Sequence, residues 1–117
     1  MGKRNRRRRS EQPSAPTTDY TDAAGNALTL RGALSPATRR RYADTLQGGL
    51  QREDAWQRAT ELLFEHLTVA WTIAGVRTDA PRELLGRYRM ASAAERTFVR
   101  HSLRTHLAEN FPDMEAP

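Results

Sequence analysis

The sequence has 117 residues, enough for one small domain, and its formal net charge of +5 combines 19 basic with 14 acidic side chains. There is no cysteine, which excludes disulfides, thiolate metal sites and cysteine nucleophiles. No apolar run approaches the ~18 residues of a membrane-spanning helix, and the N-terminus lacks the apolar segment of a signal peptide, so we expect a cytoplasmic protein.

The positive charge is concentrated at the N-terminus. Residues 1–9 contain six basic side chains and no acidic one, whereas the rest of the chain contains 13 basic and 14 acidic side chains. The stretch 1–18 has no apolar periodicity and is rich in charged residues, Ser, Pro and Thr. Such a composition cannot bury a core, so these residues are predicted to form a disordered tail and linker.

A hairpin and a first helix are predicted to follow. Leu28 and Leu30 alternate with polar residues after a turn-forming sequence, which predicts one short β-hairpin over 20–31. Ser35 and the proline after it form a helix start, because the hydroxyl can accept a backbone N–H and proline has no N–H to lose in the first turn. This helix is predicted over 36–46.

The main helix is predicted over 52–74. Its core-facing residues recur at three- and four-residue steps: Trp56, Ala59, Leu63, Leu67, Ala70 and Ala74. The segment 67–74 is also rich in β-branched residues, which would suit a strand. We favour a helix because the helical spacing continues without a break from Trp56.

Two further helices complete the body, over 81–89 and 93–110. The last has the clearest start, because Ser92 and Glu95 have the spacing of a capping box. The predicted fold is therefore mainly α, a small bundle of about four helices with one short hairpin ahead of it. It occupies one domain, 19–112, and residues 113–117 are expected to be disordered.

Catalytic and metal sites are not indicated. There is no G-x-S-x-G motif for a serine nucleophile, and His101 and Ser102 are adjacent on a helix, where their side chains diverge. His101 and His106 are five residues apart rather than the four typical of paired ligands, so we interpret both as surface or half-buried side chains. We predict a non-enzymatic protein with no metal, cofactor or small-molecule substrate.

The basic tail is the strongest binding feature. Its cations are Lys3, Arg4, Arg6, Arg7, Arg8 and Arg9. Side chains of this kind neutralise phosphates and release counterions, which favours nucleic acid in a salt-dependent, sequence-independent way. An acidic protein or an anionic membrane surface fits the same charges, and a purely solubilising tail is a further possibility.

A second basic feature lies on the last predicted helix. Arg96, Arg100 and Arg104 are four residues apart and form one ridge, a candidate polyanion-binding face. The helices 81–89 and 93–110 also have the spacing of a helix-turn-helix. The alternative function is therefore a sequence-specific DNA-binding protein that reads bases with this last helix.

We predict that the body binds a protein partner or a second copy of itself. The apolar end of the main helix is the expected interface, with Trp71, Ile73 and Val76 as contact residues. The chain is thus interpreted as a helical adaptor or assembly protein whose Arg-rich tail tethers it to nucleic acid or another polyanion. A phage-type assembly chaperone is a further alternative, on analogy of layout alone.

Overall fold

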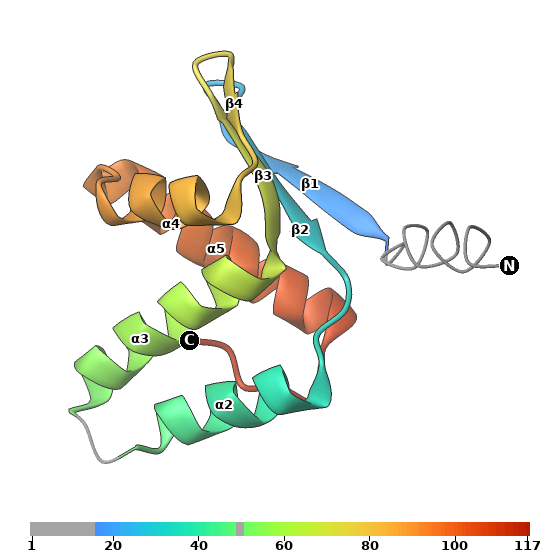
Figure 1. The fold of residues 1–117 in the computed structure, drawn as a ribbon, viewed down its shortest axis with the longest axis vertical. Helices are drawn as coiled ribbons and strands as arrows, with labels where there is room; N and C mark the ends of the chain where they lie inside the picture. The colour runs from blue at the N-terminus through green and yellow to red at the C-terminus, as the bar shows by residue number, and fades with distance from the viewer. Residues whose placement is uncertain (1–15, 49–50) are drawn as a thin grey trace, which may run out of the picture.

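Pairs of strands alternate with pairs of helices along the chain. A computed structural model describes residues 16–48 and 51–117, so that most of the predicted tail, 1–15, lies outside the described residues. The elements in chain order are β1 (Thr17–Thr21), β2 (Ala27–Arg31), α2 (Pro36–Leu46), α3 (Arg52–Leu67), β3 (Thr68–Ile73), β4 (Val76–Thr78), α4 (Pro81–Arg89) and α5 (Ala93–Asn110). Figure 1 shows α2 to α5 packed beside a tall, twisted sheet.

The predicted fold class, a mainly α bundle with one hairpin, is wrong. The four strands form one antiparallel sheet in the order β1-β2-β3-β4. The end of the predicted main helix is β3, in which Trp71 lies opposite Leu28 of β2. The helical spacing is informative only as far as Leu67, because the later alanines Ala70 and Ala74 carry little packing information. Beyond Leu67 the β-branched residues favour the extended backbone, and pairing with β2 satisfies its hydrogen bonds.

A tight turn joins β3 to β4 and makes the second hairpin possible. Ile73 pairs with Val76, so the turn consists of Ala74 and Gly75, which have φ angles of 52° and 81°. Two consecutive positive φ angles are typical of the type I′ turn that suits the twist of paired strands. The amide of Ala74 donates to Oδ1 of Asn26 at 3.0 Å, which ties this turn to the β1–β2 turn.

The other predicted helices are confirmed, and the first hairpin is longer than predicted. Helices are found at 36–46, 81–89 and 93–110, and the first hairpin is found with β1 beginning at Thr17, inside the predicted linker. The side chain of Ser35 accepts the backbone N–H of Thr38 at 3.1 Å. The Ser92–Glu95 capping box is present in both directions, with distances of 3.1 and 2.9 Å.

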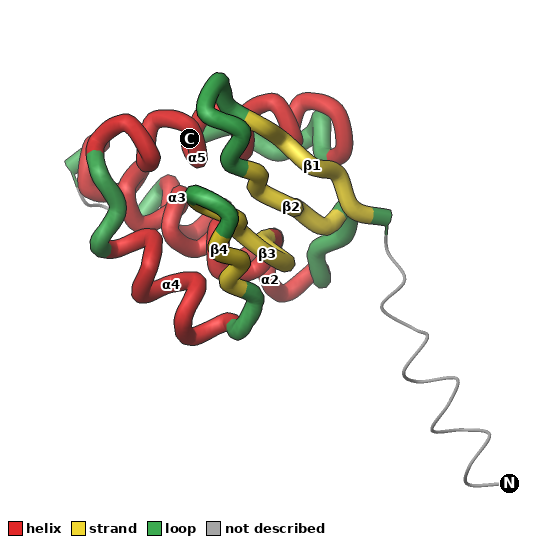
Figure 2. Tube along the Cα trace, turned by 90° about the horizontal axis from the view of Figure 1, so that it is seen from above, coloured by secondary structure: helices red, strands yellow, loops and turns green. Residues whose placement is uncertain are grey.

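The core lies between the helices and one face of the sheet, and the strands gather on one side of the helices in Figure 2. Side chains alternate along β1 and β2, so that Leu28 and Leu30 face the core while Thr17, Asp19 and Thr21 of β1 are exposed. The buried hydrophobic cluster comprises Leu28, Leu30, Tyr42, Ala59, Leu63, Phe64, Leu67, Trp71, Leu84, Tyr88, Val99, Leu103, Leu107 and Phe111.

The C-terminal segment lies along α2. Phe111 is buried and the guanidinium of Arg39 lies 5.1 Å from the centroid of its ring. Arg39 also pairs with Asp113 at 3.7 Å, and the hydroxyl of Tyr42 donates to the carbonyl of Glu115. These contacts involve part of the stretch 113–117, for which the sequence predicts disorder.

Tyr42 is expected to make stability depend on alkaline pH. Burial, and then the charge of Glu115, raises the pKa of Tyr42 above its ordinary value. The folded state therefore keeps the phenol proton to higher pH than the unfolded state does. This contribution is complete below the unfolded pKa of about 10 and is lost as the pH rises toward the folded value.

The check is urea unfolding of the wild type and Tyr42→Phe over a pH series. At neutral pH the variant is expected to lose about 1 kcal/mol with the hydrogen bond. Above pH ~10 its unfolding free energy should fall less steeply than that of the wild type. If the unfolding free energy of the two proteins falls equally steeply above this pH, Tyr42 is not the source of the pH dependence.

Candidate functional site

The predicted arginine ridge on α5 is divided in the structure. The guanidinium of Arg96 donates to the carbonyl oxygen of Arg89 at 2.6 Å and lies 5.6 Å from the ring centroid of Tyr88. The guanidinium of Arg96 therefore contacts α4. Arg100 and Arg104 are exposed, and Arg100 faces a hollow beside α3.

This hollow, the α3–α5 groove, is lined by Gln51, Arg52, Glu53, Trp56 and Arg100 and has a volume of about 480 Å³. It is the outer rim of the contact between the two helices. Further along α3 the core residues are Ala59 and Leu63. Trp56 is one turn before them and is therefore half-buried at the edge of the same face.

The groove has an excess of cations. The Arg52 guanidinium lies 5.0 Å from the centroid of the Trp56 ring, in cation–π geometry. Arg52 and Arg100 are absent from the four ion pairs found in the described part of the chain, which use Arg39, Arg77, Arg87 and Arg89. Glu53 supplies the one carboxylate among the lining residues. Two guanidinium groups, one from each helix, therefore line this hollow together with the Trp56 indole.

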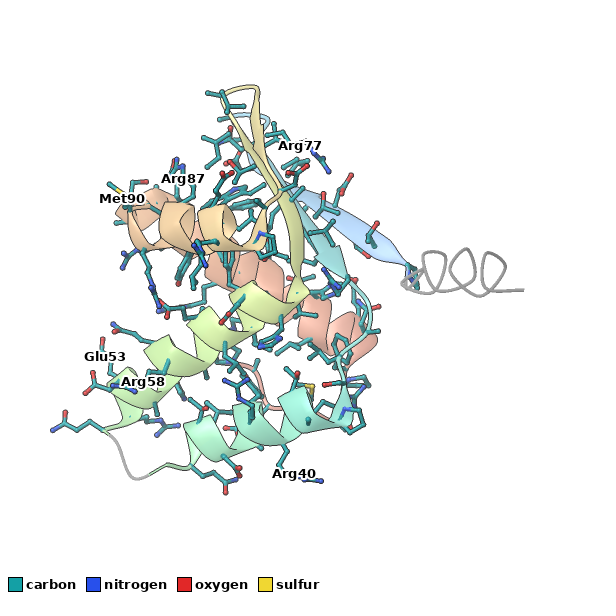
Figure 3. All side chains as sticks on the ribbon, viewed as in Figure 1. Arg40, Glu53, Arg58, Arg77, Arg87 and Met90 are labelled. Atoms are coloured by element: carbon teal, nitrogen blue, oxygen red, sulfur yellow. The ribbon has the colours of Figure 1, made fainter. Side chains whose placement is uncertain are left out.

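A second hollow beside α4 has a different character. It has a volume of about 700 Å³, and its lining includes Arg87, Glu95 and the 85 % exposed Met90. Arg87 of α4 and Met90, which follows it, lie above Glu53 and Arg58 of α3 in the view of Figure 3. Arg87 pairs with Glu95 at 2.9 Å and lies 5.4 Å from a ring centroid of Trp71. The one arginine that lines this hollow is thus paired within the protein, and Glu83 adds a second carboxylate to the lining.

Two carboxylates are held by arginines of α4. Glu61 accepts two hydrogen bonds from Arg89, at 2.8 and 3.1 Å, and this interaction lowers the pKa of Glu61. Hydrogen bonding by Arg87, together with the backbone of Ser92, lowers the pKa of Glu95. These ion pairs join α4 to α3 and α5, so contacts between helices explain the lowered pKa values of both carboxylates.

The predicted partner contacts lie in different environments. Trp71 is 1 % exposed and belongs to the core, where its ring meets Phe64 edge-on at 5.6 Å. Ile73 is partly buried against that cluster. Val76, at 67 % exposure, is the one of the three whose side chain is largely open to solvent.

Sequence reasoning missed two residues of the groove. Trp56 was assigned to the core stripe, and Arg52 was not singled out. A signal existed, because residues four apart on a helix are neighbours, and an arginine one turn before a tryptophan is typical of cation–π stacking. Nothing in the sequence near Arg100 indicates that this residue of α5 lies beside the start of α3.

The remaining sequence-predicted site residues, from Lys3 to Arg9, lie outside the described residues. Over 16–48 and 51–117 there is no group of three His, Asp or Glu side chains placed to hold a metal ion. In the same ranges no helix has the length and apolar character needed to cross a bilayer. No protein-family model, curated protein or solved structure matches this chain.

Proposed function

We propose that this protein is a non-enzymatic adaptor or assembly protein. Its Arg-rich tail, residues 3–9, binds a polyanion, nucleic acid in the first place, and its folded body binds a protein partner. A cytoplasmic location, predicted from the sequence, belongs to this proposal.

The separation of charge along the chain supports a tail that binds a polyanion and a body that binds a protein. The described residues contain thirteen arginines and thirteen carboxylates. The whole net charge of +5 therefore resides in residues 1–15. A folded body with no net charge attracts phosphates weakly at long range, whereas a run of cations attracts them strongly.

The alternative is sequence-specific DNA binding by α5. Arg100 and Arg104 are exposed on this helix, which favours that function. Arg96, however, lies in the N-terminal half that would read base edges, and its guanidinium bonds to Arg89 instead. The balanced charge of the body also weakens the alternative, because DNA-binding domains carry a net positive face.

The test is a salt titration of binding to labelled duplex DNA, single-stranded DNA and RNA. The full chain is compared with a variant in which Lys3 and the tail arginines are replaced by serine. Six cations that each neutralise one phosphate predict a log–log slope of about −5 for duplex DNA, and the variant should lose nearly all of this slope.

Three results would be decisive. Loss of binding with the tail charges supports the proposal. Retained binding by the tail variant with preference for one DNA sequence would establish the alternative on α5. Absence of binding by the full chain, even at low salt, would remove nucleic acid as the partner of the tail.

A further inference from the structure

We propose that the α3–α5 groove binds a short acidic segment of a protein partner. A carboxylate of that segment lies between Arg52 and Arg100, and a neighbouring apolar side chain packs against Trp56. This inference rests on the proposed function, since it names the site and the chemistry by which the folded body recognises its partner.

The two arginines select a carboxylate. They come from different helices, line one hollow, and take part in none of the ion pairs of the described residues. A guanidinium presents a planar fork of donors that matches a carboxylate with two parallel hydrogen bonds. Arg52 is in addition held over the Trp56 ring at 5.0 Å, so less side-chain freedom is lost when it binds.

Trp56 selects an apolar neighbour of that carboxylate. Its indole is half-buried at the rim, whereas Ala55 and Ala59 on either side of it in α3 are buried. Tryptophan and arginine are the residue types that most often dominate binding energy in protein interfaces. The volume of about 480 Å³ falls within the ~300–1,000 Å³ of small binding sites, which suits a few side chains.

The surrounding charges favour a peptide over a nucleic acid strand. Glu53 lines the groove and Asp54 follows it in the first turn of α3. A chain of phosphates in the groove would meet the carboxylate of Glu53, and the described residues as a whole have equal numbers of arginines and acidic side chains. A peptide instead brings backbone N–H groups, which Glu53 can accept, and only one or two negative charges.

The test is an NMR titration of the ¹⁵N-labelled full chain with the peptide acetyl-Gly-Glu-Asp-Leu-Gly-amide. The chain has two tryptophans, so the buried Trp71 provides an internal reference for the indole N–H of Trp56. We expect a saturable shift of the Trp56 signal with little change at Trp71. The peptide with Gln and Asn in place of Glu and Asp should bind about tenfold more weakly, because charge-assisted hydrogen bonds are lost.

Matched variants localise the site. Arg100→Gln and Trp56→Leu are each expected to weaken binding about tenfold, whereas Arg40→Gln, at an exposed arginine of α2 that does not line the groove, should leave it unchanged. Equal binding of the charged and amide peptides, no saturable shift, or a Trp56 shift produced by oligo-deoxythymidine and not by the peptide would each overturn the inference. The tail variant separates the two proposals, because it should bind the peptide like the wild type whether or not the tail binds nucleic acid.

Discussion

Replacing Phe64 with alanine is expected to lower the free energy of unfolding by about 3–5 kcal/mol. Phe64 is fully buried on α3, with its ring stacked on Tyr88 of α4 at 4.8 Å and edge-on to Trp71 of β3 at 5.6 Å. The substitution removes both aromatic contacts and leaves a cavity at the junction of the two helices and the sheet. Because native proteins are stable by only roughly 5–15 kcal/mol, this loss is a large fraction of the total.

Urea denaturation followed by far-UV circular dichroism measures this effect, and Phe98→Ala is the matched control. Phe98 undergoes the same chemical change on α5 but is only partly buried. We expect its replacement to cost clearly less, about 1–2 kcal/mol, since less apolar area is returned to water. A larger loss for Phe98→Ala than for Phe64→Ala would contradict the position of Phe64 at the centre of the core.

Replacing His106 with alanine is expected to cost about 3 kcal/mol. Nε2 of His106 lies 2.8 Å from the carbonyl oxygen of Arg31, which can only accept, so this nitrogen carries the proton. Nδ1 faces the hydroxyl of Tyr20 at 2.9 Å and the amide nitrogen of Asn110 at 3.2 Å. The ring is fully buried, so its removal leaves polar groups of β1 and β2 without partners.

Two variants separate the parts of this effect. His101→Ala, on the exposed side of the same helix, should change stability by no more than about 0.5 kcal/mol. Tyr20→Phe removes only the hydroxyl that meets Nδ1 and should cost about 1 kcal/mol. Urea unfolding gives all three values. A loss at His106 as small as that at His101 would show that the contacts with β1 and β2 contribute little.

The buried position of His106 also corrects the interpretation made from the sequence. From the sequence alone this helical histidine looks like a surface or half-buried residue, because only Asn110, one turn further along the helix, is near enough to be a partner. Its other partners are Tyr20, 86 residues away, and the backbone of Arg31, 75 residues away. Only the packing of α5 against the sheet supplies them.

The candidate site was partly predictable. The arginines of α5 are evident as a four-residue repeat, and Arg100 does line the groove. The sequence could not show that Arg96 is engaged by the carbonyl of Arg89, because that contact depends on how α4 and α5 cross. Nor could it place Trp56 at a rim instead of in the core, since both positions have the same helical spacing.

The elements with local signals could be predicted from the sequence. Ser35, Ser92 and Glu95 cap their helices through hydrogen bonds within three residues, so the caps mark the helix starts in any tertiary context. The alternation of Leu28 and Leu30 likewise predicts a strand. For 67–74 the conformation depended on the tertiary structure. A helix and a strand were both compatible with this segment, and pairing with β2, which places Trp71 opposite Leu28, made it a strand.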